Sequence, residues 1–173
     1  MQNIDKTAQP IQAEKLKPRR GRPPKISREN ADTRDLLIRS GVVALTEHGF
    51  AAAGLDSILK AVGVPKGSFY HYFKSKEDFG LAVINNYASY FAYKLDKCLL
   101  NQDYPPLERL HNFAKDAMTG IEKYDFKRGC LVGNLGQEVA LLPTSYRGLL
   151  EDIFQVWGSK VAACLAQAQA ENQ

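Results

Sequence analysis

The chain has 173 residues, enough for one domain or two small ones and for a sizeable hydrophobic core. Its 45% hydrophobic and 24% charged residues are ordinary for a soluble globular protein, and no apolar run approaches the roughly 18 residues of a membrane span. The polar, basic N-terminus has no secretory signal, and three cysteines without paired spacing argue against a disulfide framework. We therefore expect a cytoplasmic protein.

Positive charge is concentrated at the front of the chain. Residues 1–30 contain eight Lys/Arg and three Asp/Glu, whereas residues 31–173 contain fifteen and sixteen. Residues 34–76 are again basic, with six Lys/Arg and three Asp/Glu. Residues 77–173 are mildly acidic, with nine Lys/Arg and twelve Asp/Glu. A basic front joined to a mildly acidic remainder is typical of a protein that binds a polyanion.

Residues 1–30 are predicted to form a disordered basic arm, because they contain four prolines and few apolar residues. The centre of the arm reads R-G-R-P, with Arg20 and Arg22 as candidate DNA contacts. An extended core of this A·T-hook type can enter a narrow A·T-rich minor groove. The alternative is a solvated tail that only improves solubility.

The spacing of apolar residues predicts three helices in residues 31–76. The first runs from Asp32 to about Gly49, the second covers residues 55–62, and a short third covers about 66–73. Two short helices separated by a turn that contains glycine are typical of a helix-turn-helix.

Residues 63–76, G-V-P-K-G-S-F-Y-H-Y-F-K-S-K, place four aromatic residues in five positions. Phe69 and Phe73 are four apart, so both are expected to anchor the third helix on the first two. The start of the second helix of a helix-turn-helix meets base edges, and hydroxyls and lysines are common DNA contacts. The candidate DNA-contacting side chains are therefore Lys66, Ser68, Tyr70, His71 and Tyr72. The alternative, an ordinary amphipathic core helix, leaves the polar-tipped aromatics unexplained.

Residues 33–80, above all G-V-P-K-G-S-F-Y-H-Y-F-K-S-K-E-D-F, resemble the DNA-binding domain of TetR-family transcriptional repressors. The resemblance covers roughly residues 32–165. Within it, K-R-G-C-L-V-G-N-L-G-Q-E-V is similar to the branch that responds to acrylate, N-ethylmaleimide and related electrophiles. The resemblance implies an all-α homodimeric repressor that leaves operator DNA when a small effector binds.

The resemblance adds two DNA contacts, the backbone of Gly67 and a phosphate-binding lysine at Lys76. The chain departs from the family at Ala53 and Gly54, where many members have a capping threonine that also touches phosphate.

Four further helices are predicted in residues 77–173, which the resemblance identifies as the effector-binding and dimerisation domain. They cover roughly residues 76–100, 107–121, 131–142 and 144–165, with Ser75 and Thr144 as N-caps of the first and last. No segment alternates as a strand would, so the expected fold class is all-α.

Cys130 has the most distinctive chemistry in this half of the chain. It follows Gly129 at the predicted start of a helix, beside Lys127 and Arg128, and positive charge there favours the reactive thiolate. Its position resembles that of the sensor cysteine in the electrophile-responsive relatives. The alternative is a small apolar filler. Cys98 and Cys164 are expected in the core.

The family's effector cavity lies among the fourth to seventh helices. Its candidate lining residues are Tyr87, Phe91, His111, Asn134 and Trp157, although core packing would explain most of them equally well. Arg128 or His111 could bind a carboxylate or carbonyl of the effector.

Nothing in the sequence indicates an enzyme or a cofactor: P-loop, G-x-G-x-x-G and H-E-x-x-H patterns are absent. His48, His71 and His111 lack ligand-like spacing with the cysteines, so no metal site is expected. The competing hypothesis is an architectural protein that binds A·T-rich DNA without sequence preference.

Family members usually continue into two more helices that form the dimer, whereas this sequence ends at Gln173. We therefore expect either a truncated chain, which is at best a weak dimer and a poor repressor or a non-repressing remnant, or a chain that dimerises differently. Its uncovered apolar faces are expected around Leu142, Leu149 and Trp157.

Overall fold

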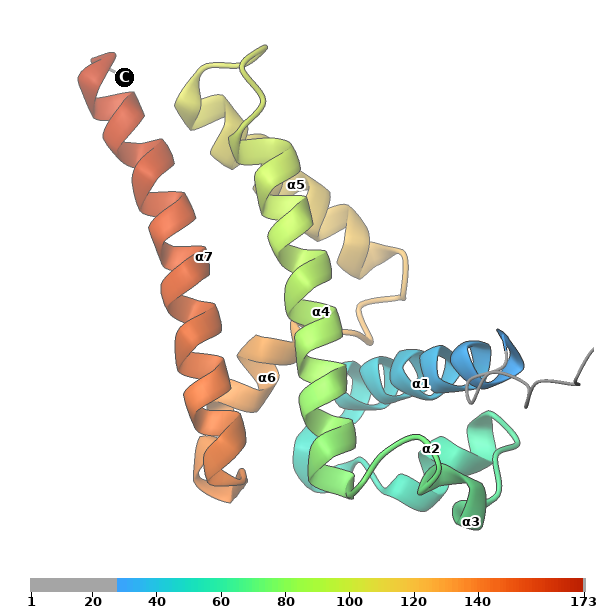
Figure 1. Ribbon diagram of the computed structural model, residues 1–173. Coiled ribbons are helices and arrows are strands. Elements are labelled where there is room, and N and C mark those ends of the chain that lie inside the picture. The colour runs from blue at the N-terminus through green and yellow to red at the C-terminus, as the bar shows by residue number, and fades with distance from the viewer. Residues whose placement is uncertain (1–27, 173) are drawn as a thin grey trace, which may run out of the picture.

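The computed structural model describes residues 28–172, with side chains from residue 32 onward. Within these residues the fold is all-α, as predicted, and no strand is present (Figure 1). The α-helices are α1 (Arg28–Ala52), α2 (Leu55–Ala61), α3 (Lys66–Phe69), α4 (Lys76–Leu99), α5 (Pro106–Glu122), α6 (Leu131–Gln137) and α7 (Thr144–Ala170), with a short 3-10 helix at Val139–Leu141. None of the described helices is long and apolar enough to cross a membrane.

Two glycines set the boundaries of the first two helices. Regular α1 geometry is interrupted at Gly49, which has φ 73° and ψ −174°, so the predicted break near this residue is confirmed. Gly63, with φ 68°, follows α2. Positive φ costs little only for glycine, so both residues suit these turns. The helix begins at Arg28, four residues before the predicted start.

Phe69 and Phe73 anchor the three-helix N-terminal unit, as their spacing predicts. Their side chains are buried, and both rings contact Phe79 of α4 at centroid distances of 5.5 and 4.9 Å. Because Phe79 joins this cluster, α4 begins inside the N-terminal core. The third helix is shorter than predicted, however: α3 ends at Phe69, and a turn carries the chain on to Phe73.

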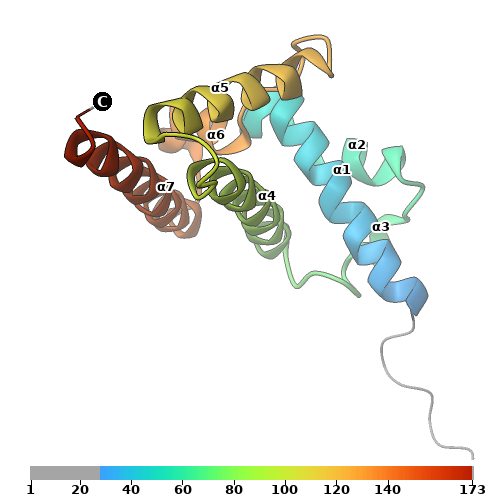
Figure 2. The ribbon, with the colours of Figure 1, turned by 90° about the horizontal axis from the view of Figure 1, so that it is seen from above.

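Helix α4 is the central element of the molecule. In two perpendicular views α7 and α1 lie on opposite sides of it (Figures 1 and 2). Its N-cap is Ser75, as predicted, and the Ser75 hydroxyl accepts a hydrogen bond from the Asp78 amide at 3.0 Å. The Asp78 carboxylate accepts one from the Lys74 amide at 2.9 Å, which fixes the chain that enters α4.

The C-terminal half corrects three expectations. Helix α6 ends at Gln137, short of the predicted 142, and the chain continues as a 3-10 helix. Thr144 is the first residue of α7 rather than its cap, because Pro143 occupies the cap position. Leu142 and Trp157 are buried and Leu149 is half-buried, so the predicted exposed faces were wrong. The large apolar side chains that α7 does expose are Phe154, Val156 and Leu165.

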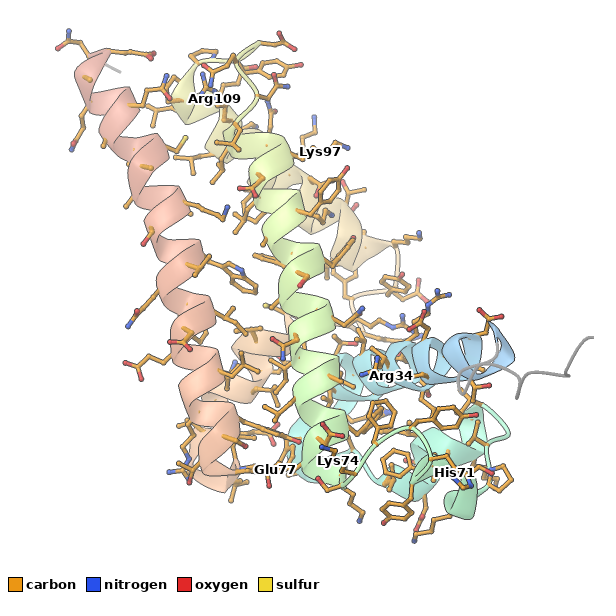
Figure 3. All side chains as sticks on the ribbon, in the orientation of Figure 1. Arg34, His71, Lys74, Glu77, Lys97 and Arg109 are labelled. Carbon is orange, nitrogen blue, oxygen red and sulfur yellow. The ribbon has the colours of Figure 1, made fainter. Side chains whose placement is uncertain are left out.

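At the end of α4 far from the N-terminal unit, Arg109 is buried (Figure 3). Its guanidinium donates to the Tyr104 carbonyl at 2.6 Å and to the side chains of Gln102 and Gln167, each at 3.0 Å. A buried guanidinium needs hydrogen-bond acceptors for its donors. Because these acceptors lie in the α4–α5 turn and on Gln167, Arg109 joins that turn to the end of α7.

Candidate nucleic-acid interface and adjoining cavity

Lys66, at the start of α3, is exposed and paired. Its ammonium lies 2.9 Å from the carboxylate of Asp56, which stands in the first turn of α2. The hydrogen bond and charge of the pair raise the pKa of Lys66 and lower the pKa of Asp56. Lys66 is therefore a charged hydrogen-bond donor. In the absence of DNA, its ammonium is paired with the Asp56 carboxylate of the same helix-turn-helix.

The remaining predicted contacts divide into exposed and packed side chains. Tyr70 is about half exposed and rests edge-on against Phe69, with ring centroids 5.2 Å apart. His71 is exposed at the α2–α3 end of the molecule (Figure 3), and Ser68 is half-buried. A Cβ added at Gly67 would meet no atom within 4 Å, so a DNA backbone could approach the peptide closely.

Tyr72 is less exposed than Tyr70 and His71. It is half-buried and packs against the hydrophobic core. Residues 70–72 form a turn after α3, and the Phe73 amide still donates to the Phe69 carbonyl at 3.1 Å, so Tyr72 stays a predicted DNA contact. Lys76, the first residue of α4, is exposed as a phosphate contact requires.

Two basic residues that sequence reasoning did not nominate lie near this surface. Arg34 of α1 is exposed, and its guanidinium stands over the Phe73 ring at 5.0 Å from the centroid. Lys74 is exposed just before α4 (Figure 3). The basic excess of residues 34–76 was the available signal, but it does not say which cations face outward.

The start of α2 lacks a side-chain cap, as the departure at Ala53 and Gly54 suggests. Gly54 occupies the cap position, and no side chain there binds the helix amides. The Ser57 hydroxyl instead donates to the Gly54 carbonyl at 2.6 Å. The candidate DNA contacts therefore centre on α3 and the start of α4.

A cavity of about 630 Å³ lies where α1, α4, α5 and the segment after α5 meet. Four of the predicted effector residues line it: Tyr87, Phe91, Arg128 and Cys130. The other lining residues are Arg39, Val42, Thr46, Asn86, Tyr90, Lys94, Phe113, Asp116, Ala117, Thr119, Gly120, Ile121, Lys123, Tyr124 and Gly129. Since α1 contributes to the wall, a bound molecule would touch a helix of the N-terminal unit directly.

Part of the cavity wall is aromatic. Tyr87 stacks on Phe91 with centroids 6.1 Å apart, and Phe113 meets Phe91 edge-on at 5.7 Å. Burial, together with the neighbouring Cys130 thiol, raises the pKa of the Tyr87 hydroxyl. Tyr87 is therefore an uncharged hydroxyl beside the Cys130 thiol in the cavity wall.

Three predicted lining residues lie elsewhere. Trp157 packs on Phe91 at 4.1 Å between centroids and belongs to the core, and His111 is exposed on α5. The Asn134 amide donates to the Thr46 carbonyl at 3.3 Å, so it joins α6 to α1. These corrections share one cause: helical spacing shows that side chains share a face, but not which neighbour that face meets.

The cations around the cavity are partly neutralised. Lys94 pairs with Asp116 at 2.5 Å, and Arg128 pairs with Glu47 at 2.7 Å while standing 4.1 Å from the centroid of the Tyr124 ring. No ion pair of the other two lining cations, Arg39 and Lys123, occurs between described side chains. The lining therefore combines aromatic surface with an excess of positive charge.

Cys130 stands at the cavity wall and serves as the N-cap of α6, where its sulfur accepts a hydrogen bond from the Gly133 amide at 3.4 Å. The expected positive surroundings are weaker than the sequence suggests, because Lys127 pairs with Asp125 at 3.4 Å and Arg128 with Glu47. Cys164 is buried, and Cys98 is half-buried rather than fully in the core.

Residues 37–83 match the family model of bacterial regulatory proteins of the tetR family, and residues 106–173 match the tetracyclin repressor-like C-terminal domain. The chain is also 47% identical over 154 residues to the transcriptional regulator AcuR of Cereibacter sphaeroides, covering 89% of this chain and 70% of that relative. The chain belongs to the TetR family.

Other TetR-family relatives agree. The repressor NemR of Escherichia coli K12 is 32% identical over 120 residues, covering 69% of this chain and 60% of NemR. A TetR regulatory protein from Rhodobacter sphaeroides superposes with a TM-score of 0.76 at 48% identity over 79% of this chain and 72% of that one. The structure of reduced E. coli NemR superposes with a TM-score of 0.73 at 28% identity, over 81% of this chain and 72% of NemR.

TetR-family membership decides against the two alternatives considered in the sequence analysis, an enzyme and an architectural DNA-binding protein. The relatives are transcriptional regulators, so this chain is a DNA-binding regulator and not an enzyme. It also favours the regulator over the architectural protein, because the helices beyond α3 match a regulator's C-terminal domain.

Proposed function

We propose that this TetR-family chain represses transcription by binding a partly palindromic operator through α3 and its flanks. The observation that supports it best is the division of residues 66–73 into two groups: Phe69 and Phe73 are buried, whereas Lys66 and Tyr70 are exposed. Selection from a random DNA library, followed by sequencing, tests the proposal. A palindromic consensus supports it, and recovery of unrelated sequences contradicts it.

We propose a division of function between two parts of the chain. Residues 31–76 bind DNA in the cytoplasm, where a bacterial operator lies, and residues 77–173 bind the effector.

Arg20 and Arg22 lie outside the described residues, and we propose that the basic arm adds minor-groove contact. Deleting residues 1–25 removes seven Lys/Arg and should reduce the dependence of affinity on salt. An unchanged salt dependence would rule the arm out.

We also propose that two copies bind the operator together. Specific helix-turn-helix binding normally needs two recognition helices about 34–36 Å apart, one turn of DNA. The apolar side chains that α7 exposes, Phe154, Val156 and Leu165, offer surface for a second copy. Sedimentation at micromolar concentration distinguishes a tight dimer from the weak association expected from the sequence.

The effector is proposed to occupy the cavity and to carry an apolar body with an acidic group. Tyr87, Phe91 and Phe113 provide aromatic contact, and Arg39 and Lys123 provide positive charge that described carboxylates do not pair. Thermal-shift titration with benzoate and with benzyl alcohol tests the role of the ligand's negative charge, because the two ligands have nearly the same shape. Stabilisation by benzoate alone supports an acidic effector, and equal responses contradict it.

Cys130 is the proposed site of covalent response to electrophiles. Its thiolate would add to the alkene of N-ethylmaleimide, forming a carbon–sulfur bond while the neighbouring carbon takes up a proton. The adduct would fill part of the cavity beside Tyr87, which supports an effect on α1 and α4. A Cys130→Ser variant that loses the response to N-ethylmaleimide but keeps the response to benzoate would separate covalent from reversible sensing.

A further inference from the structure

Glu138, immediately after α6, binds the broken end of α1. One of its carboxylate oxygens accepts a hydrogen bond from the Phe50 amide at 3.1 Å, and the other accepts from the Ala51 amide at 2.8 Å. The two segments are 87 and 88 residues apart in the sequence. We call these two hydrogen bonds the Glu138 clasp.

The backbone at Gly49 makes the clasp possible. Its positive φ breaks the regular geometry of α1, and the next two amides, those of Phe50 and Ala51, donate to the Glu138 carboxylate. A Cβ at Gly49 would lie 2.0 Å from a Glu138 carboxylate oxygen. Only glycine therefore gives both the conformation and the room for the carboxylate.

Helix α6 joins the clasp to the cavity. Its N-cap, Cys130, lies in the cavity wall, and Glu138 stands at the other end of the seven-residue helix. The same segment is fixed to α1 at its start, where the Gly129 amide donates to the Thr46 carbonyl at 3.1 Å. Asn134, in the middle of α6, donates to the same carbonyl.

The clasp acts on the part of α1 that leads into the DNA-binding helices. Residues 50–52 pass directly to Gly54 and the start of α2, and α2 holds Lys66 through Asp56. A molecule bound at Cys130 therefore lies at the start of the segment that ends in Glu138. Glu138 meets the end of α1, which leads into α2, through two charge-assisted hydrogen bonds.

We propose that the Glu138 carboxylate is the positioning residue that couples the cavity to the DNA-binding helices. The inference rests on the proposed effector response, and it assigns transmission to α6 and the clasp rather than to α4 alone. Without the clasp, the cavity can still be filled, but the orientation of α2 and α3 no longer follows its state.

Glu138→Gln tests this, because the amide keeps the size of the side chain but replaces one acceptor with a donor. Glu108→Gln, which changes an exposed glutamate of α5, is the matched control. For each chain, operator affinity is measured before and after labelling with N-ethylmaleimide, with labelling at Cys130 checked by peptide mapping. The readout is the ratio of the two dissociation constants.

We expect labelling to weaken operator binding of the parent and of Glu108→Gln by about 5–150-fold, the usual range of allosteric coupling. For Glu138→Gln the ratio should fall close to one, whether its affinity is constantly high or constantly low. An equal ratio in all three chains overturns the clasp while leaving the proposed function intact. A parent that does not respond to labelling overturns the proposed covalent response at Cys130 and the clasp with it, but not the proposed operator binding.

Amide hydrogen exchange provides a second measurement that needs neither operator nor label. The clasp predicts that Glu138→Gln exchanges the Ala51 amide faster than the parent, while amides in the middle of α4 are unchanged. Unchanged protection of Ala51 would show that the carboxylate does not hold this segment, and the inference would fail.

Discussion

Lys66 and Asp56 form an ion pair of 2.9 Å between α3 and α2. The lysine proposed to meet DNA therefore already has an anionic partner, and DNA phosphate must compete with that partner. Because both side chains are well exposed, the pair adds little to folding. Its effect should instead be visible in DNA binding.

Asp56→Asn should raise affinity for operator and random DNA alike by a few-fold, since Lys66 is released and a negative charge near the phosphates is removed. The salt dependence should become steeper, because an additional cation takes part in phosphate binding. Fluorescence anisotropy at several salt concentrations measures both quantities. Asp152→Asn, an exposed site on α7, makes the same change in net charge far from this surface. If the two variants behave alike, the ion pair does not restrain Lys66.

Tyr70→Ala should cost roughly 1–3 kcal/mol of operator binding free energy if the side chain makes a good specific contact. Tyr70→Phe separates the hydroxyl from the ring, which packs on Phe69. Loss in both variants with unchanged affinity for random DNA would assign a base-reading role to the hydroxyl. Affinities equal to those of the parent would remove Tyr70 from the interface.

Brief alkylation should modify Cys130 before Cys98 and Cys164. Cys130 lines an open cavity, whereas Cys164 is buried and its thiol donates to the Pro106 carbonyl at 3.3 Å. Burial raises the pKa of the Cys98 thiol, so less of it is thiolate at neutral pH. Peptide mapping over a time course gives the order directly, and modification of Cys98 first would contradict the sensor proposal.

Gly80→Ala should destabilise the fold by about 1–3 kcal/mol, because the new Cβ would stand 1.7 Å from the Tyr146 hydroxyl. That hydroxyl donates to the Glu77 carbonyl at 3.1 Å and joins α7 to the start of α4. Gly148→Ala in α7 is the matched control, since no atom lies within 4 Å of its Cβ. There the better helix former should stabilise by about 0.5–1 kcal/mol. Denaturant unfolding of both variants should therefore give opposite signs.

Local features of this fold were predictable because they depend on short sequence distances. The spacing of Phe69 and Phe73 predicted two buried anchors, and Ser75 predicted the start of α4. The end of α3 at Phe69 was not predicted, because no local signal distinguishes a one-turn helix followed by a turn from a longer helix.

Features that depend on packing between distant helices were not predictable. Phe91 and Trp157 are both aromatic residues on apolar faces, yet one lines the cavity and the other stands behind it. The exposure of His111 could not be predicted either, because it depends on how α5 is rotated about its axis. The contact between Glu138 and Ala51 joins residues 87 apart, and the sequence contains no pattern that pairs them.

The most direct test of the central claim is a competition titration of the parent chain against its selected operator and a shuffled sequence of the same composition. A sequence-specific regulator should prefer the operator by about 10³-fold or more, and that preference should persist as salt is raised. Equal affinity for the two DNAs, lost together with increasing salt, would show a protein that binds phosphate alone and would contradict the account.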